Sequence, residues 1–211
     1  MPTTYAHYKF GKEVLSALPR PLQNSIEAHR ELFDIGLHGP DILFYYNALK
    51  KDPVNEQGHT LHEQFADEFF HHAVEVIEKA KDPAVARAYI YGFICHFALD
   101  SECHPYVEKI MQVGRVSHNE IEMELDRMML TEDYHDPLRY LTAKHIQPKM
   151  EYAEVIAPFF KDVTAEQIYK ALKGMVFYHK LFLAPTSGKR KALFLGMKAV
   201  GKYDSLHDLS L

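Results

Sequence analysis

Residues 83–104, PAVARAYIYGFICHFALDSECH, decide the fold class of this chain. Asp82 and Pro83 place a capping carboxylate before a proline at the first helical position, which marks the start of a helix. From Ala84 to Leu99 the residues are apolar almost all round, and in a globular protein such a helix is buried in the middle of a bundle. The sequence therefore predicts a buried central helix over 83–103.

Helical periodicity and helix-start signals recur on both sides of this stretch. Capping boxes over 117–120 and 164–167 each mark a helix start, and no segment alternates like a strand. Prolines mark further starts or breaks, at Pro19, Pro21, Pro105, Pro148 and Pro185. We expect an all-α fold, a single domain over 1–211 with about eight to ten helices around the central one. The predicted helices span 6–18, 21–35, 40–49, 59–81, 83–103, 117–130, 137–145, 149–161, 165–183 and 188–200.

Composition excludes several classes of protein. The chain has 211 residues, 47% of them hydrophobic, which is enough to bury a sizeable core. Its net charge of -5 disfavours a general binder of long nucleic acids or anionic membranes, because such binding needs an excess of Lys and Arg. The longest apolar run, Ala88 to Leu99, is shorter than the roughly 20 residues of a membrane-spanning helix, and the N-terminus lacks a signal-peptide core. We expect a cytoplasmic protein without a transmembrane segment.

Cysteine and histidine usage narrows the chemistry. Cys95 and Cys103 are eight residues apart in one predicted helix, about 12 Å by helical rise, which is too far for a disulfide, so both should be reduced. The chain carries 14 His beside only 10 Gly and 11 Pro. Histidine is the commonest metal ligand and the usual general base, so the positions of these side chains become the main question.

The central helix carries a first candidate constellation, His96, Asp100 and His104, at spacings of four residues. This spacing places His96 and Asp100 on one helix face, where an imidazole and a carboxylate can bind one cation. Burying an unpartnered carboxylate costs several kcal/mol, so a cation or a hydrogen-bond network must compensate. The alternative interpretation is a core histidine that the aspartate satisfies.

A second pair, His118 and Glu122, has the same spacing on the next predicted helix. Both side chains can coordinate one metal from one helix face. Alternatively, Glu122 is one of several solvated acidic residues on that helix. Two His-x-x-x-acid pairs on successive helices, with His104 between them, favour a metal site.

Weaker candidates lie nearer the N-terminus. Asp41 follows Pro40 in a glycine-containing loop, and His7 lies near the chain start. A helix start carries His59 and His62 at i, i+3, and either could be a surface residue. The spacing leaves open which of these two histidines would be a ligand.

Taken in order, these candidates resemble the zinc-dependent phospholipase C family, most specifically in CHFALDSECHPYV and SHNEIEMELD. The resemblance covers roughly residues 1–125 and implies an all-helical fold whose zinc-site plan is shared with single-strand-specific fungal nucleases. It implies one zinc held by Asp41, His62 and His96, with Asp100 bridging to a neighbour. It implies a second zinc held by His104, His118 and Glu122.

A third zinc is held in the secreted members by the mature N-terminal residue, a histidine matching His7 and the bridging aspartate. This chain begins Met1-Pro2, so we expect its third site to be weaker. The spacing between Asp100 and His104 is also shorter than in the secreted enzymes. A set of His and carboxylate ligands without cysteine fits zinc, and manganese or iron would accept the same ligand types.

The predicted function is that of a zinc-dependent phosphodiesterase with two zinc ions and a weaker third, acting on a phospholipid or another small phosphoester. A metal-activated water would attack phosphorus in line, and Asp41 would orient or deprotonate it. Two alternatives remain, since a fold does not fix a function. One is a nuclease or nucleotide phosphoesterase on the same metal plan, and the other is a non-catalytic metal-binding or lipid-binding protein with a closed site.

The C-terminal stretch is basic and amphipathic. Lys189-Arg190-Lys191 is followed by Leu193, Phe194, Leu195, Lys198 and Lys202. Such a stretch could make a peripheral contact with anionic lipid or with substrate phosphate. We favour a solvated helix face instead. His179 lies on the preceding predicted helix, which could line the same cleft, and nothing else in the sequence supports a role for it.

Overall fold

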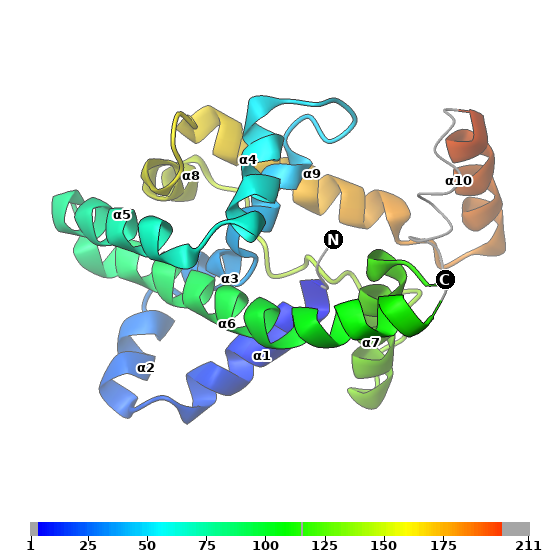
Figure 1. The fold of residues 1–211 in the computed structure, drawn as a ribbon, viewed down its shortest axis with the longest axis horizontal. Coiled ribbons are helices and arrows are strands. Elements are labelled where there is room, and N and C mark those ends of the chain that lie inside the picture. The colour runs from blue at the N-terminus through cyan, green and yellow to red at the C-terminus, as the bar shows by residue number, and fades with distance from the viewer. Residues whose placement is uncertain (1–3, 115, 200–211) are drawn as a thin grey trace.

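The computed structural model describes residues 4–114 and 116–199. Within these ranges it contains ten α-helices, two 3-10 helices and no strand, which confirms the all-α prediction (Figure 1). The helices are α1 (Thr4–Ala17), α2 (Arg20–Glu27), α3 (Arg30–Gly36), η1 (Gly39–Tyr45), α4 (Pro53–Glu63), α5 (Ala66–Lys79), α6 (Pro83–Val113), α7 (His118–Glu132), α8 (Met150–Ile156), η2 (Ala157–Phe159), α9 (Ala165–Phe182) and α10 (Ser187–Ala199).

Helix α6 is the central element, and it contacts α1, α2, α3, α5, α7, α8 and η1 (Figure 1). The Asp82 side chain accepts a hydrogen bond from the Ala84 N–H and so caps the helix as predicted. Its first half buries Tyr89 and Phe93 in the main hydrophobic core. Burial all round was the wrong expectation, because Ile94 and Phe97 of the same helix are 43% and 42% exposed.

The predicted end of this helix at 103 is also wrong, since α6 continues through Pro105 to Val113. A proline inside a helix removes one N–H and leaves the carbonyl four residues earlier without its partner. Here both Pro105 and Ser101 are exposed, so water can satisfy that carbonyl. The longer helix carries His104 in its middle rather than at its end.

Close helix packing brings η1 against α6. A Cβ at Gly36 would lie 2.1 Å from the Tyr89 carbonyl oxygen, so only glycine permits this approach of α3 to α6. Gly39 follows with a φ of +46°, and a Cβ there would lie 2.3 Å from the His96 ring. These two glycines place the segment that carries Asp41 directly beside His96.

Several predicted boundaries change. The predicted helix over 21–35 is divided into α2 and α3 at His29. The predicted helix over 59–81 is divided into α4 and α5 at Phe65. Helix α4 also starts earlier than predicted, at Pro53, after a capping box on Asp52. The 40–49 segment forms the short 3-10 helix η1. Residues 137–145 form turns instead of a helix. There, the Thr142 and His145 side chains bond to His179 and His38, and these long-range contacts override local helical preference.

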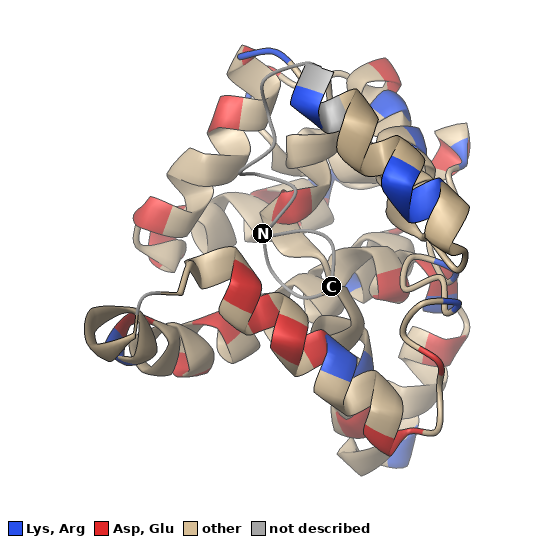
Figure 2. Cartoon of the chain, turned by 90° about the vertical axis from the view of Figure 1, so that its right-hand side faces the viewer, with Lys and Arg blue, Asp and Glu red and all other residues tan. Residues whose placement is uncertain are grey.

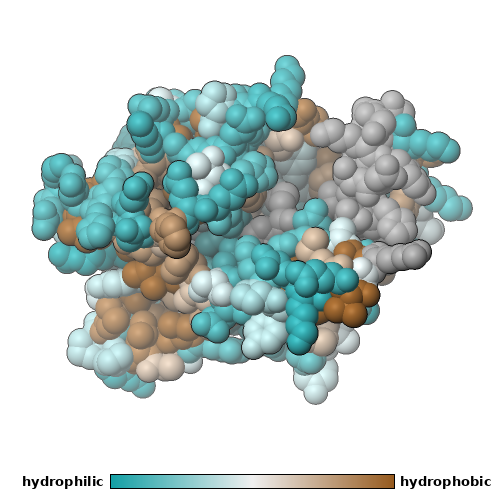
Figure 3. Space-filling model, viewed as in Figure 1, coloured by the Kyte–Doolittle hydropathy of each residue, from teal (hydrophilic) through white to brown (hydrophobic). Residues whose placement is uncertain are grey.

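The surface is mostly hydrophilic in Figure 3, with apolar side chains gathered on one face over α6 and its neighbours.

Cys95 is buried and Cys103 is partly buried, and both are free thiols, as the spacing predicted. In the part of the chain that the structure describes, no helix is long and apolar enough to cross a membrane.

Candidate metal centre

All eight predicted ligands come together where five elements meet. They are His7 from α1, Asp41 from η1, His62 from α4, His96, Asp100 and His104 from α6, and His118 and Glu122 from α7. The structure forms three groups from them, within each of which the potential ligand atoms lie within 4.8 Å of one another. These groups are Asp41, His62 and His96; His7, His96 and Asp100; and His104, His118 and Glu122.

His62 and Asp41 form one side of the centre. The Nδ1 of His62 lies 2.7 Å from the Gly58 carbonyl oxygen, so it donates its hydrogen there and leaves Nε2 as the ring nitrogen that can bind a cation once it is deprotonated. That Nε2 lies 3.0 Å from Asp41 Oδ1 and 3.6 Å from Asp100 Oδ2. The neighbouring His59 is exposed and packs its ring on Phe44. The structure therefore brings His62, and not His59, into the cluster.

Asp100 links the three groups. Its Oδ1 lies 3.2 Å from His7 Nε2, and its Oδ2 lies 3.3 Å from His96 Nε2 and 3.9 Å from His104 Nε2. The His7 and His96 rings are stacked with centroids 4.4 Å apart, which holds both imidazoles beside the same carboxylate. A carboxylate with one oxygen toward each of two groups has the arrangement that a bridging ligand needs.

The third group lies at the start of α7. The Ser117 side chain accepts a hydrogen bond from the Glu120 N–H and caps this helix, which sets the position of His118 in its first turn. His118 Nε2 lies 2.7 Å from Glu122 Oε1, and its ring meets the edge of His104 with centroids 5.2 Å apart. His104 and His118 are partly exposed, so this group is nearest to solvent.

The arrangement passes a direct test of fit to a cation. Asp41 Oδ1, His62 Nε2, His96 Nε2 and Asp100 Oδ2 are buried and make no hydrogen bond with any described residue. Three pairs of these atoms nevertheless lie close together. His62 Nε2 is 3.0 Å from Asp41 Oδ1 and 3.6 Å from Asp100 Oδ2, and His96 Nε2 is 3.3 Å from Asp100 Oδ2. Ligands at about 2.0–2.2 Å from a tetrahedral zinc are separated by roughly 3.4 Å. The separations of these nitrogen and oxygen atoms therefore match those of ligand atoms around a shared cation.

Comparison with known proteins bears on the same residues. A family model described as zinc-dependent phospholipase C matches residues 6–174. The chain belongs to this family. The match includes all eight candidate ligands and reaches well beyond the segment over 1–125 that carries the motifs. No curated protein and no solved structure gives a significant match.

Electrostatics in this zinc-dependent phospholipase C family member follow from carboxylates buried beside imidazoles. Burial alone would lower the pKa of His62, but Asp41 and Asp100 outweigh it and raise that pKa to about 9. The pKa of His7 is raised in the same way, mainly by Asp100. For Asp100, burial favours a higher pKa, but His7 and His96 hold it well below its usual range. Metal binding must then displace protons from the imidazoles.

Glu122 behaves differently from Asp100. It is buried, and burial raises its pKa above the ordinary value even though His118 lies against it. A carboxylate that is costly to ionise in isolation is stabilised when a cation binds beside it. The solvated-surface interpretation of Glu122 is therefore wrong, because its side chain is only 8% exposed.

A second layer of buried and half-buried histidines surrounds η1, and the sequence spacing did not reveal it. His38, just before η1, pairs with His145 through their Nε2 atoms at 2.7 Å, and Tyr8 stacks on the His145 ring. His179 on α9 contacts the Tyr45 hydroxyl at 3.0 Å and the Thr142 hydroxyl at 2.9 Å. The element that carries Asp41 is thus held at both ends by imidazoles. Their partners lie more than 100 residues away, or in a segment predicted as helix, so no local pattern could indicate them.

The first turn of α1 is anchored by α7. The two carboxylate oxygens of Asp126 accept hydrogen bonds from the N–H groups of Tyr5 and Ala6 at 2.9 and 2.8 Å. Asp133 accepts from the Tyr5 hydroxyl and from the Lys9 ammonium group. These contacts fix the position of His7, the next residue along α1. Met1 and Pro2, on which the prediction of a weaker third site depends, lie outside the described residues.

Proposed function

We propose that this protein is a zinc-dependent phosphodiesterase that hydrolyses the phosphodiester of a phospholipid headgroup. Membership of the zinc-dependent phospholipase C family supports a zinc phosphoesterase-like function. The observation that carries the proposal is the convergence of buried nitrogen and oxygen atoms that are close together and not hydrogen-bonded. Clusters of this composition suit zinc, and two neighbouring cations suit phosphoryl transfer.

In this proposal Asp41, His62 and His96 hold one ion, and His104, His118 and Glu122 hold a second. Asp100 connects the two groups, and His7 with Asp100 forms the weaker third site. When bound, zinc lowers the pKa of a water molecule and neutralises the charge that develops on the phosphoryl oxygens. Asp41 orients this water and accepts its proton on a carboxylate oxygen. The Gly58 carbonyl keeps His62 in the tautomer whose Nε2 can act as a ligand.

Charge around the centre favours a small substrate. Helix α7, which supplies His118 and Glu122, also carries Glu120, Glu124 and Asp126 and forms an acidic row in Figure 2. A long polyanion would be repelled by this row, whereas a single headgroup phosphate can reach the partly exposed His104 and His118. This favours a phospholipid over single-stranded DNA as substrate.

The proposal is tested by metal analysis and a substrate screen on protein purified without chelator. We expect two or more zinc equivalents per chain and release of a phosphorylated headgroup and diacylglycerol from phosphatidylcholine. Chelation should abolish the release, and added zinc should restore it. Cleavage of single-stranded DNA in place of lipid would support the nuclease alternative. Full zinc content with no cleavage of either substrate would show a non-catalytic metal site, and less than one equivalent would contradict the proposal.

A further inference from the structure

Helices α9 and α10 carry a charge opposite to that of the whole chain. Residues 165–199 contain seven Lys and Arg against one acidic residue, Glu166, a net charge of +6 in a protein whose net charge is -5. Figure 2 shows the separation, with blue residues on α10 and a red row along α7. A basic region on an otherwise acidic protein is a local electrostatic site that the overall charge conceals.

Helix α9 has one buried face and one exposed face. Its buried face, which includes Ile168 and Leu172, packs in the main core, and α9 contacts η1 and α8. The opposite face exposes Lys173, Phe177, Lys180 and Leu181, at the i, i+4, i+7 and i+8 positions of a single stripe. Phe177 is 57% exposed and Leu181 is 36% exposed. Apolar and cationic side chains therefore alternate on the outer surface of α9.

Helix α10 stands at the end of α9 (Figure 1) and carries further exposed basic and apolar side chains. None of its described side chains is buried. Lys189 donates hydrogen bonds to the Lys180 and Leu183 carbonyl oxygens, and Arg190 donates one to the Ala184 carbonyl oxygen. These two cations hold α10 on the end of α9. Lys191 and Lys198 are exposed, and Leu195 between them is 70% exposed.

We propose that this α9–α10 surface docks the protein on an anionic lipid membrane. The surface comprises Lys173, Phe177, Lys180, Leu181, Lys191, Leu195 and Lys198. Its lysines attract anionic headgroups, and its exposed apolar side chains can enter the boundary between headgroups and acyl chains. Considered alone, the C-terminal stretch favoured a solvated face. The exposed phenylalanine and leucine of α9 change that interpretation, because they extend the basic surface with apolar side chains that water solvates poorly.

Docking is a binding property, so it is measured separately from hydrolysis. The metal-loaded protein is sedimented with vesicles of a non-hydrolysable phosphonate analogue of phosphatidylcholine alone, and with vesicles of equal parts of the phosphonate analogues of phosphatidylcholine and phosphatidylserine. We expect tighter binding to the mixed vesicles by ~10-fold or more, with an affinity that falls as salt is raised. Equal binding to both vesicles, or no binding to either, would overturn docking while leaving the proposed hydrolysis untouched.

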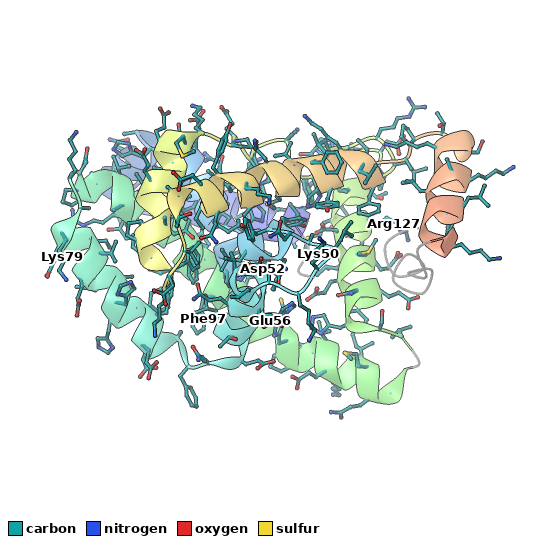
Figure 4. All side chains as sticks on the ribbon, turned by 90° about the horizontal axis from the view of Figure 1, so that it is seen from above. Lys50, Asp52, Glu56, Lys79, Phe97 and Arg127 are labelled. Atoms are coloured by element: carbon teal, nitrogen blue, oxygen red, sulfur yellow. The ribbon has the colours of Figure 1, made fainter. Side chains whose placement is uncertain are left out.

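Charge-reversal variants test the location of the surface. Lys191→Glu combined with Lys198→Glu should lower binding to the mixed vesicles by ~10-fold or more. The matched control is Lys79→Glu combined with Lys81→Glu, which reverses the same number of exposed charges. Figure 4 shows Lys79 at the opposite end of the molecule from α10. The control should lower binding by less than ~3-fold, the general effect of a more negative net charge.

Two further experiments test the apolar side chains of the surface and its preference for lipid over another polyanion. Phe177→Ser combined with Leu195→Ser should weaken binding at high salt, where the electrostatic attraction is screened. Thermal unfolding of each variant shows that it remains folded. Equal losses for the two charge-reversal variants would contradict a defined docking surface. Preferential binding of single-stranded DNA over the mixed vesicles by the unmodified protein would likewise overturn the lipid assignment.

Discussion

Two groups of buried or half-buried histidines lie within one molecule, and their partners differ. His7, His62 and His96 face the carboxylates of Asp41 and Asp100. His38, His145 and His179 face hydroxyl groups or one another. Burial raises the cost of a positive charge in both groups. In the first group the carboxylates reverse this cost and raise the pKa of His62 to about 9. In the second, burial dominates and lowers the pKa of His145 to about 3 and that of His179 to about 4.

The difference shows that histidine has two roles in this protein, as a candidate metal ligand in the inner group and as a hydrogen-bond partner in the outer group. Carboxylates concentrate negative charge at the inner histidines, which makes the centre attractive to a cation. The outer imidazoles are neutral, so they add no positive charge near that cation and act through hydrogen bonds on the ends of η1. Two kinds of experiment test this difference. One removes the negative charge of Asp100 from the inner group, and the other measures how stability depends on pH through His179 in the outer group.

The largest effect is expected from Asp100→Asn, which keeps the side-chain size and removes the charge that links the three groups. Zinc content should fall by at least one equivalent, and phosphodiesterase activity should fall with it, because the remaining imidazoles lose their shared anion. Elemental analysis and the lipid assay measure both. Apo protein should also unfold at a lower temperature than metal-loaded protein, since the ligand stabilises only the folded state.

The control for this change is Asp34→Asn. Asp34 is also a buried carboxylate, but its partner is Arg30, whose Nε lies 2.7 Å away, and it lies outside the centre. This variant should lose stability and keep its metal. An Asp100→Asn protein with unchanged zinc content would remove the bridging role, and Asp100 would then be only the hydrogen-bond partner of a core histidine, a change worth about 1–3 kcal/mol.

A smaller effect separates two histidines that are three residues apart. His62→Ala removes a side chain whose Nε2 is directed at Asp41, so it should lower zinc content by about one equivalent. His59→Ala changes only an exposed ring packed on Phe44 and should leave metal content and activity as they were. Metal analysis of the two proteins side by side decides the matter. Metal loss in the His59 variant with retention in the His62 variant would reverse the assignment.

The sequence predicted the helical class and the central helix because both depend on strong local patterns. The apolar run over 84–99 and the caps at Asp82, Ser117 and Thr164 all correspond to helix starts or cores in the structure. Long-range contacts decided the features that were predicted wrongly. Residues 137–145 form turns and not a helix, because the side chains of Thr142 and His145 bond to His179 and His38. Helix α6 tolerates Pro105 because that part of it is exposed.

For the candidate site, spacing within a helix was the informative signal. His96 with Asp100, and His118 with Glu122, are pairs that a helix must place on one face. Spacing alone left the choice between His59 and His62 open, because it depends on which face of α4 meets η1; the family resemblance implied His62. The outer group of histidines could not be predicted from the sequence, since nothing in the spacing of His38, His145 and His179 connects them. The roles of all eight candidate ligands remain predictions that the metal analyses test.

The smallest and most specific effect concerns the outer layer. His179 has a pKa of about 4 in the folded protein against 6.5 for an unperturbed histidine. A depressed imidazole pKa means that the unfolded state binds more protons between these values, so stability is full above about pH 6.5 and falls as the pH is lowered toward 4. By pH 5 the loss attributable to His179 should be about 2 kcal/mol.

His179→Gln removes this titration, so its free energy of unfolding should fall less steeply between pH 7 and pH 5 than that of the unmodified protein. The titrating ligands of the inner group are present in both proteins, and their contribution cancels in the difference. Thr142→Val is the matched control, because it removes the hydroxyl group at Nδ1 and keeps the imidazole. It should lower stability at every pH and preserve the slope. Parallel profiles for His179→Gln and the unmodified protein, measured by denaturant unfolding, would show that folding does not lower the pKa of His179, and the contrast between the two histidine layers would fail at that residue.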